Sequence, residues 1–487
     1  MCGFAGYYKK AGITDENKLS AREMSYSIRH RGPDLDRVYE CEKLIFAFRR
    51  LSIIDLEGGG QPFISDDGRF ICVYNGEIYN YLELKSELEK KGHCFKTNSE
   101  VEVMVTLYSL YGAGFISRLR GMFAFVIYDK ENDFLMAGRD PFGIKPLYYR
   151  KDSDGIVFCS EMKGYFFDKN YKGFDVDKAL LQHYLTFQYV SEPDTISGDI
   201  FILPKGSYML YDGKKDGKTD ILTYYKPVFS QNKTSTYLQK KANLRKAVES
   251  SVEYHMLADV PVGSFLSSGV DSAIITAIAS KISPGIKAFT IGFDVKGYSE
   301  LEDAAAISSH LDIDHIKLQC TLKDFTDNYE RVIYHLDSPM ADPSVVAIYL
   351  ISREAAKHVK VILSGEGSDE LFGGYRQYAS AIPAAKIYSL PSFIKSFLMI
   401  LARLLPEHVK GKGLITRGCV PIEQRFVGNA FVFSENEKRG ILRTYDSNVH
   451  FTQRTKDIYT QVGDYTMIQK MQHCDLNTWL PSDILVK

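Results

Sequence analysis

The sequence predicts two successive domains, an α+β domain followed by an α/β domain built on a doubly wound parallel sheet. A chain of 487 residues is too long for a single hydrophobic core. Strand-like runs separated by turn residues dominate the first 170 or so residues, whereas strand-like and helix-like segments alternate from residue 260 onward. We therefore divide the chain into a domain over 1–190, a connecting segment over 191–240 and a second domain over 241–487.

The first domain shows the pattern of antiparallel strands joined by turns. Runs of β-branched and aromatic residues, broken by Gly, Asp and Asn, predict strands within 43–55, 69–80, 121–140 and 145–161. Apolar residues at helical spacing predict helices within 80–92 and 99–112. Grouped strands with few helices are typical of an antiparallel sheet in an α+β domain.

The second domain shows regular alternation. Short, almost wholly apolar runs predict buried strands within 260–268, 286–293, 314–318 and 359–365. Helical spacing fills the intervals at 271–282, 299–311, 322–336 and 344–359. This order favours a parallel sheet covered by helices on both faces. Over 380–460, helical spacing of apolar residues is the pattern that can be read.

Composition excludes several classes of function. A net charge of -1 gives no basic surface for nucleic acid. The eight cysteines are scattered without a CxxC pair, which argues against zinc and against a disulfide scaffold, and favours a cytoplasmic protein. The N-terminus lacks the apolar core of a signal peptide. The most apolar stretch, 390–406, contains Lys395 and Arg403 and is short for a membrane span, so we expect an amphipathic or buried helix and no membrane partner.

The segment S-S-G-V-D-S at 267–272 lies between a predicted strand and a predicted helix. Backbone N–H groups at a helix start bind anions, and Gly269 lets the backbone approach a phosphate closely. Asp271 beside a phosphate requires a cation between them, which implies Mg²⁺. The chain has no G-x-x-x-x-G-K-[ST] motif, so this is not a Walker loop. The structural alternative is an ordinary capped turn.

A second polar loop, S-G-E-G-S-D-E-L-F-G-G-Y at 364–375, follows a later strand. Ligands of α/β domains bind at the carboxyl ends of strands, so both loops are expected on one rim. Its acidic residues Glu366, Asp369 and Glu370 repel one another unless a metal or cation neutralises them. A solvated acidic loop is the alternative, and the neighbouring L-F-G-G-Y fits it poorly.

Together the two loops resemble the synthetase domain of the glutamine-dependent asparagine synthetase family, and S-S-G-V-D-S is similar to the S-G-G-x-D-S pyrophosphate loop of N-type ATP pyrophosphatases. Ser268 replaces the first glycine of that loop. The resemblance implies ATP-dependent adenylation of a carboxylate, with Glu366 assisting acyl-adenylate formation and amidation. It assigns Mg²⁺ to Asp271 and Asp369. The ATP-binding residues that it implies are Phe265, Ser267, Gly269, Asp271, Ser272, Ile291, Ser364 and Gly365.

The first domain resembles class II glutamine amidotransferases, which are αββα N-terminal-nucleophile hydrolases. The matching motifs run in family order: R-H-R-G-P-D (29–34), R-R-L-S-I-I-D-L-E-G-G-G-Q-P (49–62), Y-N-G-E-I-Y-N (74–80), T-N-S-E-V-E-V (97–103) and R-D-P-F-G-I-K-P-L-Y-Y (139–149). The nucleophile of that family is a cysteine at the start of the mature chain, which is Cys2 once Met1 is removed. By position alone, Cys2 would be a small thiol near a loose end.

The chemistry requires these residue types. A free α-amine, with a pKa of about 8, can serve as base for the thiol of the same residue. The thiolate attacks the glutamine amide, forms a thioester and releases ammonia. The family places the oxyanion donors at Asn75 and Gly76. The glutamine α-carboxylate calls for a guanidinium at Arg50, and its α-ammonium calls for carboxylates at Glu77 and Glu100, where the family commonly has Asp at the second position. The glutamine-binding residues implied are Arg50, Leu51, Ser52, Ile53, Ile54, Asn75, Gly76, Glu77 and Glu100.

The resemblance implies that glutamine, ATP and a small carboxylate, aspartate by default, give asparagine, glutamate, AMP and pyrophosphate, with ammonia moving through an internal apolar passage. Alternatives are amidation of a cell-wall or surface-sugar acid, a glutaminase whose synthetase half is inactive, and a non-catalytic nucleotide-binding scaffold. Ser338 stands where the family has an acidic residue. The sequence does not decide whether the protein forms a homodimer. The chain ends at N-T-W-L-P-S-D-I-L-V-K, where the family continues to a catalytic lysine. The second domain is therefore expected to lack its C-terminal part, and these 487 residues alone to show glutaminase activity with weak or absent synthesis.

Overall fold

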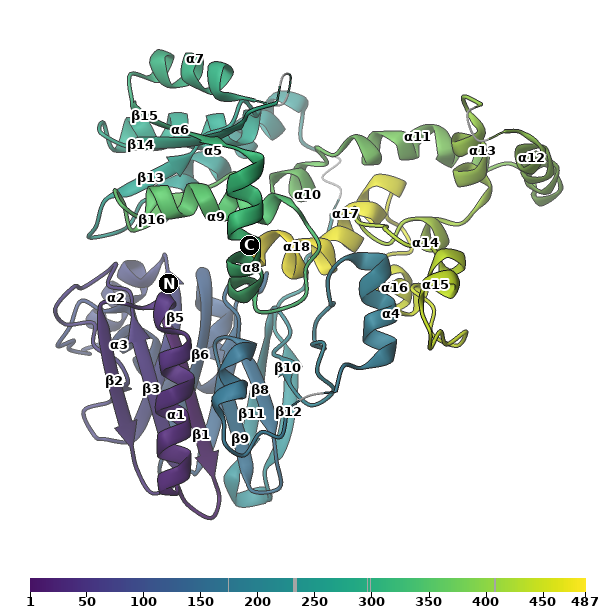
Figure 1. Ribbon diagram of the computed structural model, residues 1–487. Helices are drawn as coiled ribbons and strands as arrows, with labels where there is room; N and C mark the ends of the chain where they lie inside the picture. Colours follow the sequence, from purple (N-terminus) through teal and green to yellow (C-terminus); the bar gives the residue numbers. More distant parts are fainter. Residues whose placement is uncertain (174, 231–233, 296, 298, 407–408) are drawn as a thin grey trace.

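The computed structural model describes residues 1–487 except 174, 231–233, 296, 298 and 407–408. Two six-stranded antiparallel sheets make up the N-terminal half, and a four-stranded parallel sheet lies in the C-terminal half (Figure 1). The α+β and α/β architectures predicted for the two halves are both confirmed.

The first sheet has the strand order β10–β8–β9–β1–β3–β2. Its strands are β1 (Gly3–Lys9), β2 (Leu35–Glu40), β3 (Leu44–Arg50), β8 (Tyr148–Lys151), β9 (Gly155–Cys159) and β10 (Phe201–Ile202). The central strand β1 pairs with β3 on one side and β9 on the other, both antiparallel. This placement fixes the start of the chain in the middle of a sheet.

The second sheet has the strand order β12–β11–β7–β6–β5–β4. Its strands are β4 (Phe63–Ile64), β5 (Phe70–Ile78), β6 (Gly121–Asp129), β7 (Phe134–Arg139), β11 (Ser207–Asp212) and β12 (Lys218–Thr223). The inner face of each sheet carries fully buried apolar side chains, such as Phe4 and Phe46 opposite Val73 and Val126, and these form one core between the sheets.

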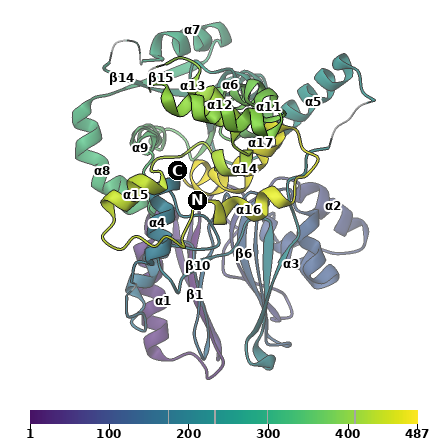
Figure 2. The same ribbon diagram turned by 90° about the vertical axis from the view of Figure 1, so that its right-hand side faces the viewer.

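Helices cover the outer faces of both sheets, so the layers run α, β, β, α (Figure 2). Helix α1 (Asp15–Ser27) packs on the first sheet, whereas α2 (Tyr81–Lys90) and α3 (Glu100–Tyr111) pack on the second. The 3₁₀ turns of this half are η1 (Arg29–Arg31), η2 (Gly112–Arg118), η3 (Met162–Phe167) and η4 (Gly213–Lys215).

The segment expected to connect the domains instead completes the two sheets. Strand β10 pairs with β8 in the first sheet, and β11 with β12 extends the second sheet next to β7. Hydrogen bonds to an open sheet edge stabilise these strands more than a linker conformation would. Just before them, Phe187 at the end of helix α4 (Lys178–Phe187) and Tyr189 beyond it pack with the C-terminal half.

The parallel sheet has the strand order β15–β14–β13–β16, formed by β13 (Val262–Phe265), β14 (Lys287–Phe293), β15 (Asp314–Cys320) and β16 (Val361–Leu363). Helices α5 (Tyr237–His255), α6 (Val270–Ile282) and α7 (Leu301–Leu311) cover one face. Helices α8 (Leu322–Leu336) and α9 (Ser344–Ala355) cover the other. The strand order reverses at β13, which pairs with both β14 and β16, and ligands bind at such a reversal.

A helical region follows the sheet. It contains α10 (Ser368–Phe372), α11 (Arg376–Tyr388), α12 (Ser392–Leu404), α13 (Lys412–Cys419), α14 (Ile422–Arg425), α15 (Glu435–Ile441), α16 (Thr452–Thr460), α17 (Met467–Asn477), α18 (Trp479–Ser482) and the turn η5 (Ile484–Val486). Helices α11 to α13 project from the body (Figure 1), and α12 exposes large apolar side chains such as Phe393, 73% exposed, while Ala402 is buried.

Across the described parts of the chain, none of the individual helices has the length and apolar character needed to cross a bilayer. The bent pair 368–388 and 392–404, with an angle of 120° between its helices, meets that criterion by length and composition only.

Candidate functional site

The middle strands of the two antiparallel sheets bring the predicted glutaminase residues together. Cys2 precedes β1, Arg50 ends β3, Glu77 lies on β5 and Glu100 begins α3. A small cavity of about 30 Å³ is lined by Cys2, Arg50, Leu51, Ile53, Ile54, Gly59, Gln61, Tyr74, Gly76, Glu77, Ser99 and Glu100. Ser52 is outside this lining, and its backbone N–H donates to Asp34 at 2.9 Å. The sequence did not single out Gly59, Gln61, Tyr74 or Ser99.

Cys2 is half-buried, and its Sγ donates to the Leu51 carbonyl at 3.6 Å. Burial raises the pKa of this thiol, while the nearby chain-terminal amine lowers it. Burial also lowers the pKa of the Met1 α-amine to about 5, and the charges of Lys145 and Arg31 lower it further. An ammonium group is therefore disfavoured at the start of this chain.

Arg31 and Lys145 are site residues that the sequence reasoning missed, although both lie in motifs that carry the family resemblance. The Arg31 Nε donates to the Cys2 carbonyl at 2.9 Å, and the Lys145 Nζ lies 3.1 Å from the Met1 sulfur. Burial lowers the pKa of Lys145 to about 8, and Arg31 adds to the effect. Asp140 accepts the Lys145 backbone N–H at 3.0 Å and so holds the lysine in place.

Asn75 lies beside the cavity rather than in its lining. It is 1% exposed, and its side-chain Nδ2 has no hydrogen-bond partner in the described part of the chain. Strand alternation places Asn75 on the face of β5 that also carries Val73, and Cys2 packs against the core on that face. A buried amide donor without a partner costs free energy unless a ligand supplies the acceptor.

Gly76 is required by the close approach of two strands. A Cβ at this position would lie 2.2 Å from the Met122 carbonyl oxygen on β6. The absence of a side chain leaves the backbone of residue 76 accessible along the cavity wall.

The guanidinium of Arg50 organises the loop that follows β3. It donates to the carbonyls of Ile54 (3.2 Å), Asp55 (2.6 Å) and Leu56 (3.0 Å). Since a guanidinium has five N–H donors, two are left for a carboxylate in the cavity.

Glu77 and Glu100 place two carboxylates in the cavity wall. The Glu100 Oε2 accepts the Ile78 N–H at 2.9 Å, whereas the Glu77 Oε2 is buried without a partner among the described residues. Burial raises the pKa of Glu100 to about 7, and burial together with the Glu100 charge raises the pKa of Glu77 well above its usual range. A bound ammonium would relieve this repulsion.

Hydrogen bonds within the loop after β13 fold it into a compact turn. The Ser272 Oγ accepts the Ser267 N–H at 3.0 Å and lies 2.9 Å from the Ser267 Oγ, and the Gly269 N–H donates to the Ser267 Oγ at 3.1 Å. The loop leads into the first turn of α6, where backbone N–H groups favour an anion. The Ser268 N–H donates to Glu300 at 3.1 Å.

The loop after β16 touches the loop after β13, as expected for two loops on one rim. A Cβ on Gly365 would lie 3.1 Å from both the Asp271 Cβ and the Ser272 N. Ser364 and Glu366 are exposed beside this contact. Below the rim, Phe265 and Ile291 pack half-buried against the same apolar cluster.

Two carboxylates of this rim suit a Mg²⁺ ion that takes its other ligands from phosphate and water. Burial raises the pKa of Asp369, and the nearby charge of Asp271 raises it further. No group of three or more His, Cys, Asp or Glu side chains suited to a metal occurs among the residues that the structure describes. Mg²⁺ is commonly bound by one or two carboxylates plus substrate phosphates, which fits this pair.

A buried chain of ion pairs joins the glutaminase cavity to the synthetase half. Arg31 pairs with Glu161 at 2.9 Å, Glu161 with Lys163, and Lys163 with Asp337 at 3.3 Å, and each of these side chains is at most 7% exposed. Asp337 also accepts the backbone N–H groups of Met162 and of Lys163, the latter at 2.7 Å. Burial alone would raise the pKa of Glu161. The hydrogen bond from His30 and the charges of Arg31 and Lys163 outweigh burial and lower this pKa.

Comparisons with known proteins agree with both halves. Residues 1–225 match the family model "Glutamine amidotransferase domain", and residues 243–487 match the model "Asparagine synthase". The chain is 41% identical to "Asparagine synthetase [glutamine-hydrolyzing] 1" of Bacillus subtilis (strain 168) over 490 residues, covering 100% of this chain and 77% of that protein. It is 36% identical to "Putative asparagine synthetase [glutamine-hydrolyzing]" of Mycobacterium tuberculosis (strain ATCC 25618 / H37Rv), covering 100% of this chain and 78% of that protein. It is 33% identical to "Asparagine synthetase B [glutamine-hydrolyzing]" of Escherichia coli (strain K12), covering 80% and 67%.

Proposed function

The chain belongs to the family of glutamine-hydrolysing asparagine synthetases, and from this we propose that it transfers the amide nitrogen of glutamine to the side-chain carboxylate of aspartate in an ATP-dependent ligase reaction. The observation that carries the proposal is the convergence of Cys2, Arg50, Glu77 and Glu100 on one cavity in a chain that also carries the phosphate loop. The products are asparagine, glutamate, AMP and pyrophosphate.

Removal of Met1 gives Cys2 a free α-amine. The buried setting and the charges of Arg31 and Lys145, which lower the pKa of the Met1 amine, act on the new amine in the same way. The amine is then neutral and takes the proton from the Cys2 thiol. The thiolate attacks the glutamine side-chain carbonyl, and the amide nitrogen leaves as ammonia. Water hydrolyses the resulting thioester to glutamate and restores the thiol.

Two groups stabilise the negative charge that develops on the carbonyl oxygen during this attack. The unpartnered Asn75 Nδ2 and the backbone N–H of Gly76 are donors positioned before the substrate arrives, so little reorganisation is needed in the transition state. Arg50 binds the substrate α-carboxylate through its free N–H groups, and Glu77 with Glu100 binds the α-ammonium.

The C-terminal half activates the acceptor. Ser267, Ser272 and the first turn of α6 bind the phosphates that leave as pyrophosphate. The aspartate side-chain carboxylate attacks the α-phosphorus of ATP and forms an acyl-adenylate. Ammonia then attacks the acyl carbon and AMP leaves, with Glu366 handling the released proton. Asp271 and Asp369 would hold Mg²⁺, which would neutralise charge on the phosphates.

Replacement of the nucleophile tests the proposal. In Cys2→Ala, glutamine hydrolysis and glutamine-dependent asparagine formation are expected to fall at least about 1,000-fold, because no other group forms the thioester. Asparagine formation from added ammonium chloride is expected to persist. The control is Cys41→Ala, since Cys41 is a half-buried thiol that packs against the same core. Ammonia release by Cys2→Ala at the rate of the control would reject the nucleophile, and failure of the unaltered protein to convert aspartate would reject the acceptor.

A further inference from the structure

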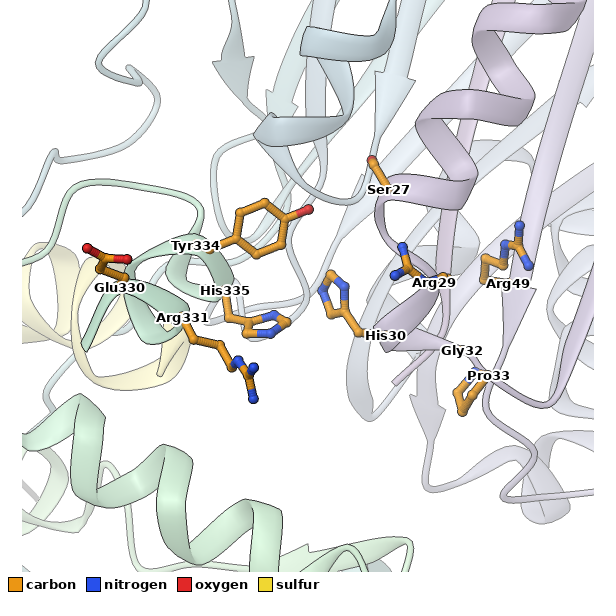
Figure 3. Close-up of a pocket in the computed structure, with 10 residues that line it drawn as sticks. All are labelled: Ser27, Arg29, His30, Gly32, Pro33, Arg49, Glu330, Arg331, Tyr334 and His335. Atoms are coloured by element: carbon orange, nitrogen blue, oxygen red, sulfur yellow. The ribbon is translucent and has the colours of Figure 1, made fainter. Parts of the chain in front are cut away.

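A second, larger cavity lies between the two halves of the molecule. Its volume is about 740 Å³, within the range of small-molecule sites, and Figure 3 shows its lining. The N-terminal half contributes residues from the end of α1, from η1 and from β3, whereas the synthetase half contributes the last turns of α8. The lining residues are Ser27, Arg29, His30, Gly32, Pro33, Arg49, Glu330, Arg331, Tyr334 and His335. None of them has a role in the reaction proposed above.

Positive charge dominates this cavity because few carboxylates neutralise its arginines. Arg331 forms no hydrogen bond or ion pair with any residue that the structure describes. Arg29 lies over the Tyr26 ring at 4.5 Å and donates to the Tyr26 carbonyl at 3.4 Å. Arg49 pairs at 3.0 Å with Asp36, a half-exposed residue outside the lining.

The carboxylate within the lining belongs to Glu330. Figure 3 shows it pointing away from the paired histidines, on the far side of Tyr334. Among the described residues, Arg29 and Arg331 therefore have no carboxylate partner, whereas Arg49 has Asp36.

Two histidines close the cavity where the halves meet. The rings of His30 and His335 lie edge to face with their centroids 4.7 Å apart, and His335 also stacks on Tyr349 at 6.1 Å. Burial lowers the pKa of His335, and the charges of His30 and Lys163 lower it further. Burial is the larger cause, and the neighbouring positive charges add to it.

We propose that the interdomain cavity binds a small phosphorylated molecule with at least two negative charges, held by Arg29, Arg49 and Arg331. Guanidinium groups recognise phosphate and carboxylate oxygens through paired N–H donors. Guanidiniums that both halves contribute to one cavity suit a tetrahedral phosphate, whose oxygens point in several directions, better than a planar carboxylate. Since Arg331 comes from one half and Arg29 from the other, the ligand bridges the halves.

The cavity also contacts the ion-pair chain between the two active sites. His30 lies in its wall, and the His30 Nε2 is 2.9 Å from the Glu161 Oε1. A ligand that shifts His30 would therefore act on Glu161, which pairs with Arg31 beside Cys2.

Pyrophosphate is the probe for the first test, and tricarballylate, a tricarboxylate of similar charge, is the comparison. Because pyrophosphate also fits the loop after β13, the readout must be local. The ¹³Cε1 signals of His30 and His335 in histidine-labelled protein, assigned with His30→Gln and His335→Gln, supply it. We expect both signals to shift on addition of pyrophosphate, and the pKa of His335 to rise as the anion offsets the positive charge.

Variants make the test specific. In Arg29→Gln/Arg331→Gln, the pyrophosphate concentration needed for half the shift is expected to rise at least about tenfold. The matched control, Arg22→Gln/Arg245→Gln, removes two exposed arginines outside the lining and should leave it unchanged. Ser272→Ala should also leave the histidine shift unchanged, which separates this cavity from the synthetase loop. Signals that do not move, an unchanged midpoint in the first variant, or tighter binding of tricarballylate would each overturn the proposal.

Discussion

Asn75 shows how a single residue is prepared for chemistry before substrate arrives. Its amide is buried on the face of β5 that points toward Cys2, and the described surroundings offer Nδ2 no acceptor. Leaving this donor unpaired costs free energy, and its hydrogen bond to the oxyanion in the transition state offsets that cost. The same reasoning applies to the unpartnered Glu77 Oε2, for which the complementary group is an ammonium.

Truncation of this donor should act on the transition state. In Asn75→Ala, kcat for glutamine hydrolysis is expected to fall about 100- to 1,000-fold, with KM for glutamine changed less than about threefold. Asn80→Ala is the control, because Asn80 belongs to the same motif but bonds the carbonyl of Arg118 at 3.0 Å. Steady-state kinetics of ammonia release measure both variants. A rise in KM at constant kcat would contradict the oxyanion role.

Glutamine binding should depend on pH through Glu100. Its pKa is raised to about 7, and the charged form binds the substrate ammonium, so protonation below that pH removes the attraction. We expect KM for glutamine to rise toward about tenfold per unit as the pH falls below 7. Glu100→Gln should have a higher KM that varies little over the same range. Initial rates from about pH 5.5 to about pH 8 decide this, and a KM that does not rise on acidification would contradict it.

The motifs identified most of the residues around the glutaminase cavity, and the resemblance supplied their roles. Arg31 and Lys145 lie within those motifs, but the motifs assign them no role. Their function depends on where β1 places the start of the chain, and sequence spacing does not give that position. Arg50 was predicted as a carboxylate ligand, but its bonds to the carbonyls of 54–56 depend on a loop path that no periodicity encodes.

At the scale of elements, the local sequence pattern predicted the strands and helices whose formation depends on neighbouring residues. The apolar and aromatic runs of β3 and β5 and the helical spacing of α6 and α9 follow from which side chains face a core, and the structure confirms these elements. Strands β10 to β12 were not predicted. Strands β10 and β11 pair with β8 and β7, which lie far away in the sequence, and β12 then pairs with β11.

Gly76 tests the contact between β5 and β6. In Gly76→Ala the new methyl would lie 2.2 Å from the Met122 carbonyl oxygen, so the strands must separate. We expect a loss of about 1–3 kcal/mol in the free energy of unfolding, and a fall in glutaminase rate because the neighbouring Asn75 moves. In Gly114→Ala, where nothing lies within 4 Å of the added Cβ, the change should stay within about 0.5 kcal/mol. Denaturant unfolding measures both, and equal stability of the two variants would contradict the packing argument.

At the scale of the whole molecule, the two halves are joined by a buried chain of charged groups. Asp337, just beyond the end of α8, accepts two backbone N–H groups of η3, and Lys163 links it to Glu161. Arg31 continues the connection to the Cys2 carbonyl. A buried ion pair is weak evidence for stability, but it fixes one arrangement of the surfaces that carry it. These contacts therefore hold the glutaminase half and the synthetase half in one arrangement, which affects how the two reactions are coordinated.

Asp337→Asn should uncouple the two reactions while leaving each half folded. The amide keeps one acceptor for η3 but loses the charge that attracts Lys163, so the end of α8 is held less firmly against the N-terminal half. Without ATP and aspartate, glutaminase activity is expected to stay within about twofold of the unaltered protein. With all substrates present, the ratio of glutamate formed to asparagine formed is expected to rise at least about threefold, because ammonia is released when the acceptor is not ready.

The matched control for this variant is Asp129→Asn. Asp129 is also buried, pairs with Arg69 at 2.7 Å and accepts backbone N–H groups, but it lies within the N-terminal half alone. Its replacement should lower the melting temperature without changing the ratio of glutamate to asparagine, because its loss leaves the interface between the halves intact. If both variants changed the ratio equally, destabilisation of the N-terminal half would explain the effect, and the ion-pair chain would have no part in coupling. If only Asp337→Asn changed it, the contacts between η3 and the end of α8 coordinate the release of ammonia with its use.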